Sequence, residues 1–509
     1  MMRFVLIFLL VSCFKGIGTS VREVTSIDDD GTTSGGETFG GATTEGADNG
    51  DSSSGSDVGG DDSGPDKVYK LELLSTMDLS EKGISSAPSG DICANDIWGW
   101  TDPDTNKEYA ILGLRNKTSF IDVSDPKNPV HLADLKGKTS SSNWRDIKVY
   151  KNFAFIVSEA SNHGLQIFDL TKLRNLDGAS VREYESEDFH YARFGNAHNI
   201  VINEQTGFAY AVGATQTTGD FRACDFSLHA INIQDPTSPS FAGCISANIA
   251  AGNPPTAPII NPSENKNSVL NENPTFKECI EMKAQTESTE LRPMHDDNDV
   301  CGKYYTHDAQ CVVYDGPDVE HKGKEICIVS NGPVGRLESR DFDPDSFHII
   351  DVSDKSSPKL LDTYVITENA GYAHQGWLTK DHQFFIANDE LDEKEKGEPN
   401  TRTIVIDVRD LDDVKHHMYF RHNSRSIDHN LYVKGDRVYH ANYNSGLMIY
   451  DISGIADREY NFLAQYDTNT SNSAVFEGMW SNYPYFESGT IIASKIETCQ
   501  LLVFKESFE

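Results

Sequence analysis

The chain has 509 residues, with 79 Asp and Glu against 44 Lys and Arg, which gives a formal net charge of −35. It contains no block of basic residues. Nucleic acid and anionic membrane surfaces need clustered Lys and Arg, so the composition argues against both as partners. The composition is still compatible with a cation, a neutral glycan or a basic protein as the partner.

The N-terminus has the pattern of a secretion signal. Arg3 precedes an apolar run of about 11 residues, which suits a signal peptide and is too short to span a bilayer. We predict a signal peptide over residues 1–20, no transmembrane segment, and a secreted or cell-surface protein. Residues 21–66 are rich in Gly, Ser, Thr and acidic residues, and Arg22 is the one basic residue among them. They are predicted to be a disordered acidic linker, more typical of a spacer than of a calcium-binding segment.

From residue 67 to the C-terminus a short pattern recurs. Each copy opens with a polar residue before an apolar run, and two further β-branched or aromatic runs follow at a repeat of roughly 50 residues. A fourth, more exposed run comes after a Pro or a loop, as at Pro129, Pro358 and Phe462. The seven copies open at Asp96, Asp146, His198, His307, His374, His429 and Glu477. We therefore predict an all-β fold, a seven-bladed β-propeller over residues 67–509.

Two irregularities refine this prediction. The seventh copy has only three strand-like runs, whereas residues 68–79 form a strand-like run before the first copy. An N-terminal strand that completes the last blade would close the ring and cover its edge. Between His198 and His307 the spacing doubles, and residues 246–300 are predicted to be an inserted surface loop between blades.

The number of cysteines also agrees with an exported protein. Eight remain without the signal peptide, an even number typical of disulfide-bonded exported proteins, although eight allow 105 connectivities. The repeat favours pairs within one blade, within the insertion, and between the first and last blades: Cys311 with Cys327, Cys224 with Cys244, Cys279 with Cys301, and Cys93 with Cys499. Asn116 and Asn469 begin glycosylation triplets.

Several segments resemble a known family. THDAQCVVYDGPD from Thr306 and AHNIVINEQTGFAYAVGA from Ala197 are similar to the choice-of-anchor B proteins, and FHIIDVSDKSSP from Phe347 resembles the LVIVD-type repeat of the same class. The resemblance covers roughly residues 90–506. It implies an exported, propeller-like domain with several anchoring modes and no catalytic residues to carry over. The chain departs from the family in the 246–300 insertion and in having no visible C-terminal anchor.

Because no catalytic residues carry over, we infer the candidate functional residues from the usual geometry of a propeller. The first strand of each blade lines the central channel, so the residues that open the repeats should meet at one mouth, together with the ends of the second strands. The openings contribute Asp96, Asp146, His198, Asn199, His307, Asp308, His374, Gln375, Asp428, His429, Asn430 and Glu477. The second strands add Glu159, Asn331, Asn388, Asp389, Glu390 and Asn442.

Three interpretations of this ring follow. The repeated polar residues form hydrogen bonds between blades, or they bind a metal or small ligand, or they catalyse a reaction. The first is favoured because repetition suits it better than a single asymmetric site. For the second, oxygen-rich subsets suit calcium, and imidazole with carboxylate suits a transition metal. Its candidate ligands are Asp146, Glu159, His198, His307, Asp308, His374, Asp389, His429 and Glu477.

Two further features have alternative interpretations. The acidic loop over residues 388–399 is either a calcium site or, as is more usual for such charge, a solvated loop. Five tryptophans lie at or beside first strands, where they pack between blades or stack on a sugar: Trp98, Trp100, Trp144, Trp377 and Trp480.

No GxSxG, HExxH, phosphate-binding loop or EF-hand pattern occurs in the sequence. We therefore expect a secreted or cell-surface scaffold that binds an extracellular protein or glycan and need not be an enzyme. The alternative is a metal-dependent hydrolase at the channel mouth, with a His or Glu as base.

Overall fold

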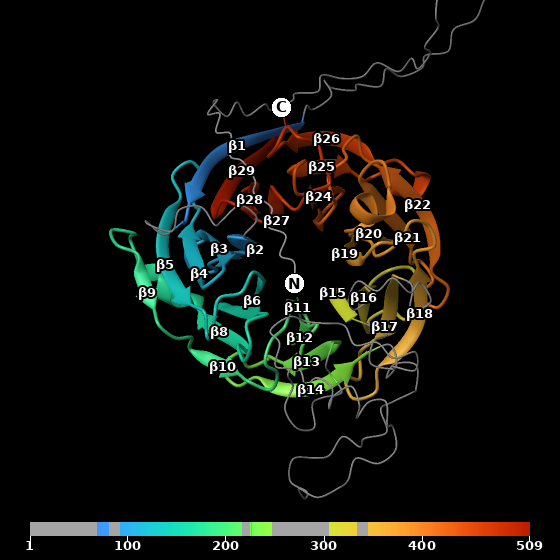
Figure 1. The fold of residues 1–509 in the computed structure, drawn as a ribbon. Helices are drawn as coiled ribbons and strands as arrows, with labels where there is room; N and C mark the ends of the chain where they lie inside the picture. Colours follow the sequence, from blue (N-terminus) through green and yellow to red (C-terminus); the bar gives the residue numbers. More distant parts are fainter. Residues whose placement is uncertain are drawn as a thin grey trace, which may run out of the picture.

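The structure is a computed structural model, and it describes residues 69–80, 92–215, 224, 226–246, 305–332 and 345–508. The predicted signal peptide and linker, nearly all of the 246–300 insertion, and Cys279 and Cys301 lie outside the described residues. The described residues form seven mainly antiparallel sheets set around a central axis (Figure 1). The fold is an all-β, seven-bladed β-propeller.

The blades follow one another along the chain, each with its first strand at the channel. Blades 1 to 3 are β2 (Ala94–Thr101), β3 (Glu108–Leu114), β4 (Lys117–Asp122) and β5 (Val130–Lys136); β6 (Arg145–Tyr150), β7 (Phe153–Ser158), β8 (Leu165–Asp169) and β10 (Phe189–Tyr191); and β11 (Asn199–Asn203), β12 (Phe208–Val212), β13 (Leu228–Asn232) and β14 (Ser240–Ile245).

Blades 4 to 7 are β15 (Tyr305–Val313), β16 (Glu325–Gly332), β17 (Ser346–Asp351) and β18 (Lys359–Val365); β19 (Ala373–Leu378), β20 (Phe384–Asp389), β21 (Arg402–Asp407) and β22 (Lys415–Arg421); β23 (Asn430–Lys434), β24 (Arg437–Ala441), β25 (Leu447–Asp451) and β26 (Asn461–Tyr466); and β27 (Met479–Tyr483), β28 (Thr490–Lys495), β29 (Gln500–Phe508) and β1 (Tyr69–Asp78). The short helical turns are η1 (Leu170–Asn175), η4 (Asp392–Lys396) and η5 (Ile455–Asp457).

The N-terminal strand closes the ring, as predicted. β1 pairs antiparallel with β29 from Tyr69 opposite Phe508 to Asp78 opposite Gln500, so the outer strand of blade 7 comes from the other end of the described chain (Figure 1). The disulfide between Cys93 and Cys499 also joins blade 1 to blade 7. Hydrogen bonds and a covalent bond therefore close the same seam.

The hydrophobic core lies between the blades. Seven clusters of buried residues each join two neighbouring sheets, as where Phe120 of blade 1 stacks on Phe168 of blade 2 with 4.7 Å between ring centroids. Because each blade packs on both faces, a middle strand such as β3 is buried along its whole length. Such strands read in sequence as continuous apolar runs rather than as alternating patterns.

Blade 2 is the least regular blade. The fourth runs identified in the sequence belong to blades 1, 4 and 6, and that of blade 2 is not among them. In the structure, this place is taken by β10, of only three residues, while the equally short β9 (Arg182–Tyr184) pairs parallel with β5 of blade 1. Runs this short carry no readable periodicity. Cys224 lies before β13, the third strand of blade 3, and pairs with Cys244 of β14 as predicted. Cys311 of β15 pairs with Cys327 of β16, also as predicted.

Candidate metal centre

Four imidazoles form an arc at one mouth of the channel. His198 precedes β11, His307 lies on β15, His374 lies on β19, and His429 precedes β23. The centroids of successive rings are 4.5, 4.1 and 4.4 Å apart, and the Trp480 indole of β27 continues the arc 4.3 Å beyond His429. All four histidines are at most 8 % exposed. Blades 3 to 7 thus each place one ring at this mouth.

β-Bulges explain how these side chains reach the channel. His307 is the extra residue where β15 shifts register between Thr306 and Asp308, and Trp480 is the extra residue between Met479 and Ser481 on β27. β2 and β19 shift register at the same mouth. A bulge leaves a residue unpaired in the ladder and changes the direction of its side chain, which is common beside functional sites.

Hydrogen bonds between blades fix two of the rings. His307 Nδ1 donates to the carbonyl oxygen of His374 at 2.9 Å, and His429 Nδ1 donates to that of Trp480 at 2.6 Å. In a neutral imidazole this leaves the lone pair on Nε2. Asn388 donates to the carbonyl oxygen of His429 instead, and His374 Nδ1 is buried with no hydrogen-bond partner. Blade-to-blade bonding is therefore one role of the repeat, and it orients the rings as metal ligands require.

Glu390 brings a carboxylate to two of these imidazoles. It follows β20, and its carboxylate oxygens lie 3.9 Å from His374 Nε2 and 3.8 Å from His429 Nε2. Both distances are too long for hydrogen bonds. Ligand atoms bound to one tetrahedral ion at about 2.1 Å are about 3.4 Å apart, so small shifts would let the three groups share a metal. Tyr443 holds the carboxylate in place, donating to Glu390 Oε1 at 2.7 Å.

The protonation states suit metal binding. Burial lowers the pKa of His429 to about 3, and burial together with His307 holds the pKa of His374 well below its usual value. Both imidazoles are thus neutral and offer lone pairs. Burial raises the pKa of Glu390 to about 7, although the Tyr443 hydrogen bond opposes this shift. A cation between the three groups would favour the carboxylate form.

His198 and Glu159 form a separate pair at the other end of the arc. His198 Nδ1 lies 2.6 Å from Glu159 Oε1. Burial lowers the pKa of His198, but the hydrogen bond and charge of Glu159, together with the charges of Asp308 and Asp96, outweigh burial, and the net pKa is raised. This histidine is therefore prone to be an imidazolium, and its Nδ1 is already engaged. It is a weaker ligand candidate than His374 or His429.

Three predicted acidic residues meet around a half-buried lysine instead of the imidazoles. Lys148 Nζ lies 2.7 Å from Asp146 Oδ1, and its pKa is raised because Asp146, Asp96 and Asp308 outweigh burial. Burial raises the pKa of Asp96 to about 6 and that of Asp308 to about 7. The lysine supplies the positive charge that a metal would otherwise supply here.

The remaining predicted ligands lie elsewhere. Asp389 is fully buried and accepts hydrogen bonds from the backbone N–H groups of Gly371 and Tyr372 at 2.8 and 2.5 Å, which engages both its oxygens. Glu477 is exposed on the loop before β27. Of the predicted glycosylation positions, Asn116 is exposed and Asn469 is half-buried. Glu390, which the sequence placed at the mouth but not among the candidate ligands, and Tyr443, which no motif distinguishes, complete the site.

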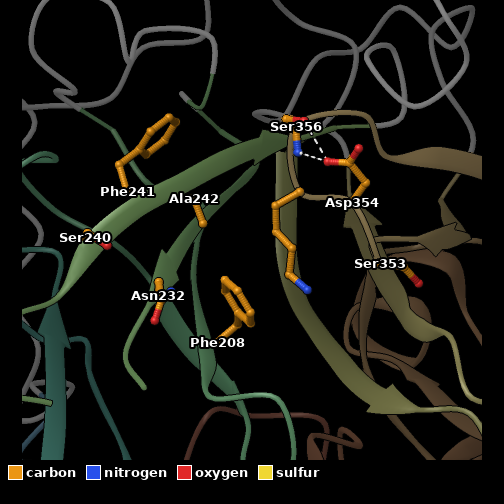
Figure 2. A pocket seen from close by; sticks show the side chains of 9 residues that line it. Phe208, Asn232, Ser240, Phe241, Ala242, Ser353, Asp354 and Ser356 are labelled. Atoms are coloured by element: carbon orange, nitrogen blue, oxygen red, sulfur yellow. Dashed lines mark hydrogen bonds between the residues drawn. The ribbon is translucent and has the colours of Figure 1, made fainter. Parts of the chain in front are cut away.

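A groove of about 410 Å³ lies between blades 3 and 4, away from this mouth (Figure 2). Phe208, at the start of β12, lines it, whereas the arc lies beside the other end of that strand. Lys355 crosses it, with Nζ 4.0 Å from the centre of the Phe208 ring and ion-paired to Glu325. The charge of Lys355, the one buried cation that lines the groove, is thus already neutralised by Glu325.

A family model described as the LVIVD repeat matches residues 342–365, which include β17 and β18. The chain has no significant match among curated proteins. No helix within the described residues has the length and apolar character of a membrane span.

Three solved structures with a similar backbone fold each share 10 % sequence identity with this chain. The β-propeller domain of Cps50 (Swd1) from Myceliophteria thermophila has a TM-score of 0.45, with 83 % of this chain and 98 % of that chain covered. Hydrazine synthase from Kuenenia stuttgartiensis has 0.48, with 83 % and 98 % covered. A functionally unknown protein from Desulfotomaculum acetoxidans has 0.43, with 81 % and 98 % covered. These likenesses carry no inference about function.

Proposed function

We propose that this chain is an exported binding scaffold whose channel mouth holds a transition-metal ion through His374, His429 and Glu390, and that the ion helps to bind an extracellular protein or glycan. One observation carries the proposal: two imidazole Nε2 atoms lie 3.8 and 3.9 Å from the same carboxylate. Two neutral nitrogens and one oxygen suit zinc or a similar ion. Three protein ligands leave a coordination position for an outside group.

Export is supported by chemistry away from the site. Three disulfides lie in the described residues, and stable disulfides are typical of proteins outside the cytosol. The signal-like N-terminus and the resemblance to choice-of-anchor B proteins agree with this location. An extracellular partner then follows as the natural ligand of the scaffold.

A metal-dependent hydrolase is the second candidate, since three protein ligands and an open position also describe catalytic zinc. The His307 ring packs against that of His374, and its Nε2 could accept a proton. However, burial and the neighbouring His198 hold the pKa of His307 well below its usual value, so it is a weak base near neutral pH. This favours binding over hydrolysis.

The first test is zinc titration by calorimetry of the secreted chain after treatment with chelator. We expect one zinc ion per chain, and an affinity at least about a hundredfold lower in the His374→Ala/His429→Ala double variant, because both nitrogens are direct ligands. His416→Ala, on the outer strand β22, should bind as the unaltered chain does. Equal zinc binding in all three proteins would disprove the site.

Binding and hydrolysis are then separated with the zinc-loaded chain. It is applied to arrays of glycans and extracellular proteins with and without chelator, and in parallel to ester and phosphate substrates. A scaffold should give partners that are lost with the metal and no turnover. Turnover that disappears in the double variant would establish the hydrolase instead.

A further inference from the structure

Three carboxylates converge inside the wall between blades 5 and 6. Asp392 and Glu393 open the turn η4, between β20 and β21, and Asp428 lies shortly before β23. One oxygen from each lies within 4.8 Å of the others. Asp392 and Asp428 are fully buried and Glu393 is 9 % exposed. The part of the acidic loop that carries Asp392 and Glu393 is therefore not solvated, unlike the exposed Lys394, Glu395 and Lys396.

Four oxygens of this cluster have no hydrogen-bond partner. They are Asp392 Oδ1, Glu393 Oε2 and both oxygens of Asp428. The other two oxygens accept from Arg402, whose Nε bonds Asp392 at 2.8 Å and whose backbone N–H bonds Glu393 at 2.9 Å. A buried acceptor without a donor is rare and destabilising, and four in one place indicate a missing positive group.

The described charges do not supply that group. Arg402 is fully buried, lies 2.8 Å from Asp392 and 3.7 Å from Asp389, and is shared with Glu398 at 3.8 Å. One guanidinium thus faces more carboxylates than it can neutralise. Without a cation, the cluster would have to hold protons.

We infer that Asp392, Glu393 and Asp428 bind a hard divalent cation of the calcium class, at a site separate from the imidazole centre. The donors are oxygens alone, which suits calcium, whereas the channel centre offers imidazole nitrogens. The cation would connect the β20–β21 loop of blade 5 to the entry of blade 6.

The two sites are neighbours along the chain. Asp428 immediately precedes His429, and Asp392 follows Glu390 by two residues. A cation on the carboxylates would therefore fix the two segments that carry the imidazole centre's ligands. The inference does not require that centre to bind metal, because it rests on oxygens that take no part in it.

The test compares calcium binding and melting temperature for the unaltered secreted chain and four variants after removal of metal. Calcium should raise the melting temperature of the unaltered chain by several degrees, since a ligand that binds only the folded state stabilises it. Asp428→Asn, which keeps the shape and removes one charge, should lose the rise and at least about tenfold in affinity, because ligand charge sets calcium affinity. Glu393→Gln should behave likewise, and Glu395→Gln, on the exposed side of the same turn, should respond as the unaltered chain does.

A different set of results is expected if the three carboxylates bind no calcium. If the carboxylates are merely protonated, calcium leaves the melting temperature of the unaltered chain unchanged, and Asp428→Asn is as stable or more stable because repulsion is relieved. That outcome overturns the inference. Magnesium and zinc titrations establish the cation class. The His374→Ala/His429→Ala variant should keep the calcium response, so failure of the imidazole centre and failure of the carboxylate site are distinguishable.

Discussion

At the scale of the residue, one position of the repeat serves two purposes. Asp146 uses both carboxylate oxygens within the fold, accepting from Ile147 N–H at 2.7 Å and from Ile200 N–H of the next blade at 2.8 Å. At His374 Nδ1 the corresponding bond to the next blade is absent, whereas His429 Nδ1 bonds Trp480 of the next blade. At both histidines it is Nε2 that faces Glu390, so the same repeat position can serve the fold and the candidate metal centre.

This contrast predicts the effect of Asp146→Ala. Two buried N–H groups lose their acceptor and Lys148 loses its closest anion, each at about 1–3 kcal/mol, so the free energy of unfolding should fall by about 3 kcal/mol. Urea unfolding measures the loss, and zinc affinity should not change. Asp436→Ala, at an exposed turn, should lie within about 0.5 kcal/mol of the unaltered chain. A loss of zinc binding without loss of stability would make Asp146 a ligand after all.

At the scale of the element, strands were predictable and register was not. Local apolar runs predict the strands, as the continuous apolar run of the fully buried β3 illustrates. The repeat pattern opens its last copy at Glu477, whereas the bulge on β27 places Trp480 in the arc. A polar residue before an apolar run does not reveal a one-residue bulge. The contact from Glu390 in blade 5 to His429 in blade 6 has no sequence signal either, because it depends on the packing of two blades.

Cross-strand pairing within a blade predicts a pH dependence. Asp134 on β5 faces Ser119 on β4, which donates to it at 2.5 Å, and Lys117 lies 2.8 Å away. Burial disfavours the charged form, but these contacts and a hydrogen bond with His131 outweigh burial and lower the pKa of Asp134 to about 2. In the unfolded chain it is about 3.9. The lowered pKa stabilises the fold above pH 4, and this contribution is lost as the pH falls toward 2.

The measurement is the unfolding free energy of the unaltered chain and of Asp134→Asn between pH 7 and pH 2. The difference should be about 2.5 kcal/mol above pH 5 and should shrink to near zero at pH 2, because the shift in pKa sets both its size and its range. A difference that stays constant with pH would mean that the carboxylate's charge contributes nothing to the blade.

At the scale of the whole molecule, seven inter-blade clusters leave no single centre of stability, so the ring depends on closure. The seam between blades 7 and 1 is held twice. β1 covers the edge of β29 and packs Met77 against the hydrophobic cluster between blades 7 and 1, and the Cys93–Cys499 disulfide joins residues 406 positions apart. Without β1, β29 would be an exposed edge.

Removing the disulfide and removing β1 should therefore have different effects. Cys93→Ser/Cys499→Ser should stay monomeric and closed through β1, but lose roughly 5 kcal/mol of unfolding free energy, because a long loop is no longer constrained in the unfolded chain. Deletion of residues 69–80 should leave the disulfide intact yet cause concentration-dependent association through the bare edge of β29. Urea unfolding and light scattering measure the two effects. If the deleted chain stays monomeric and equally stable, β1 is dispensable and the disulfide alone closes the ring.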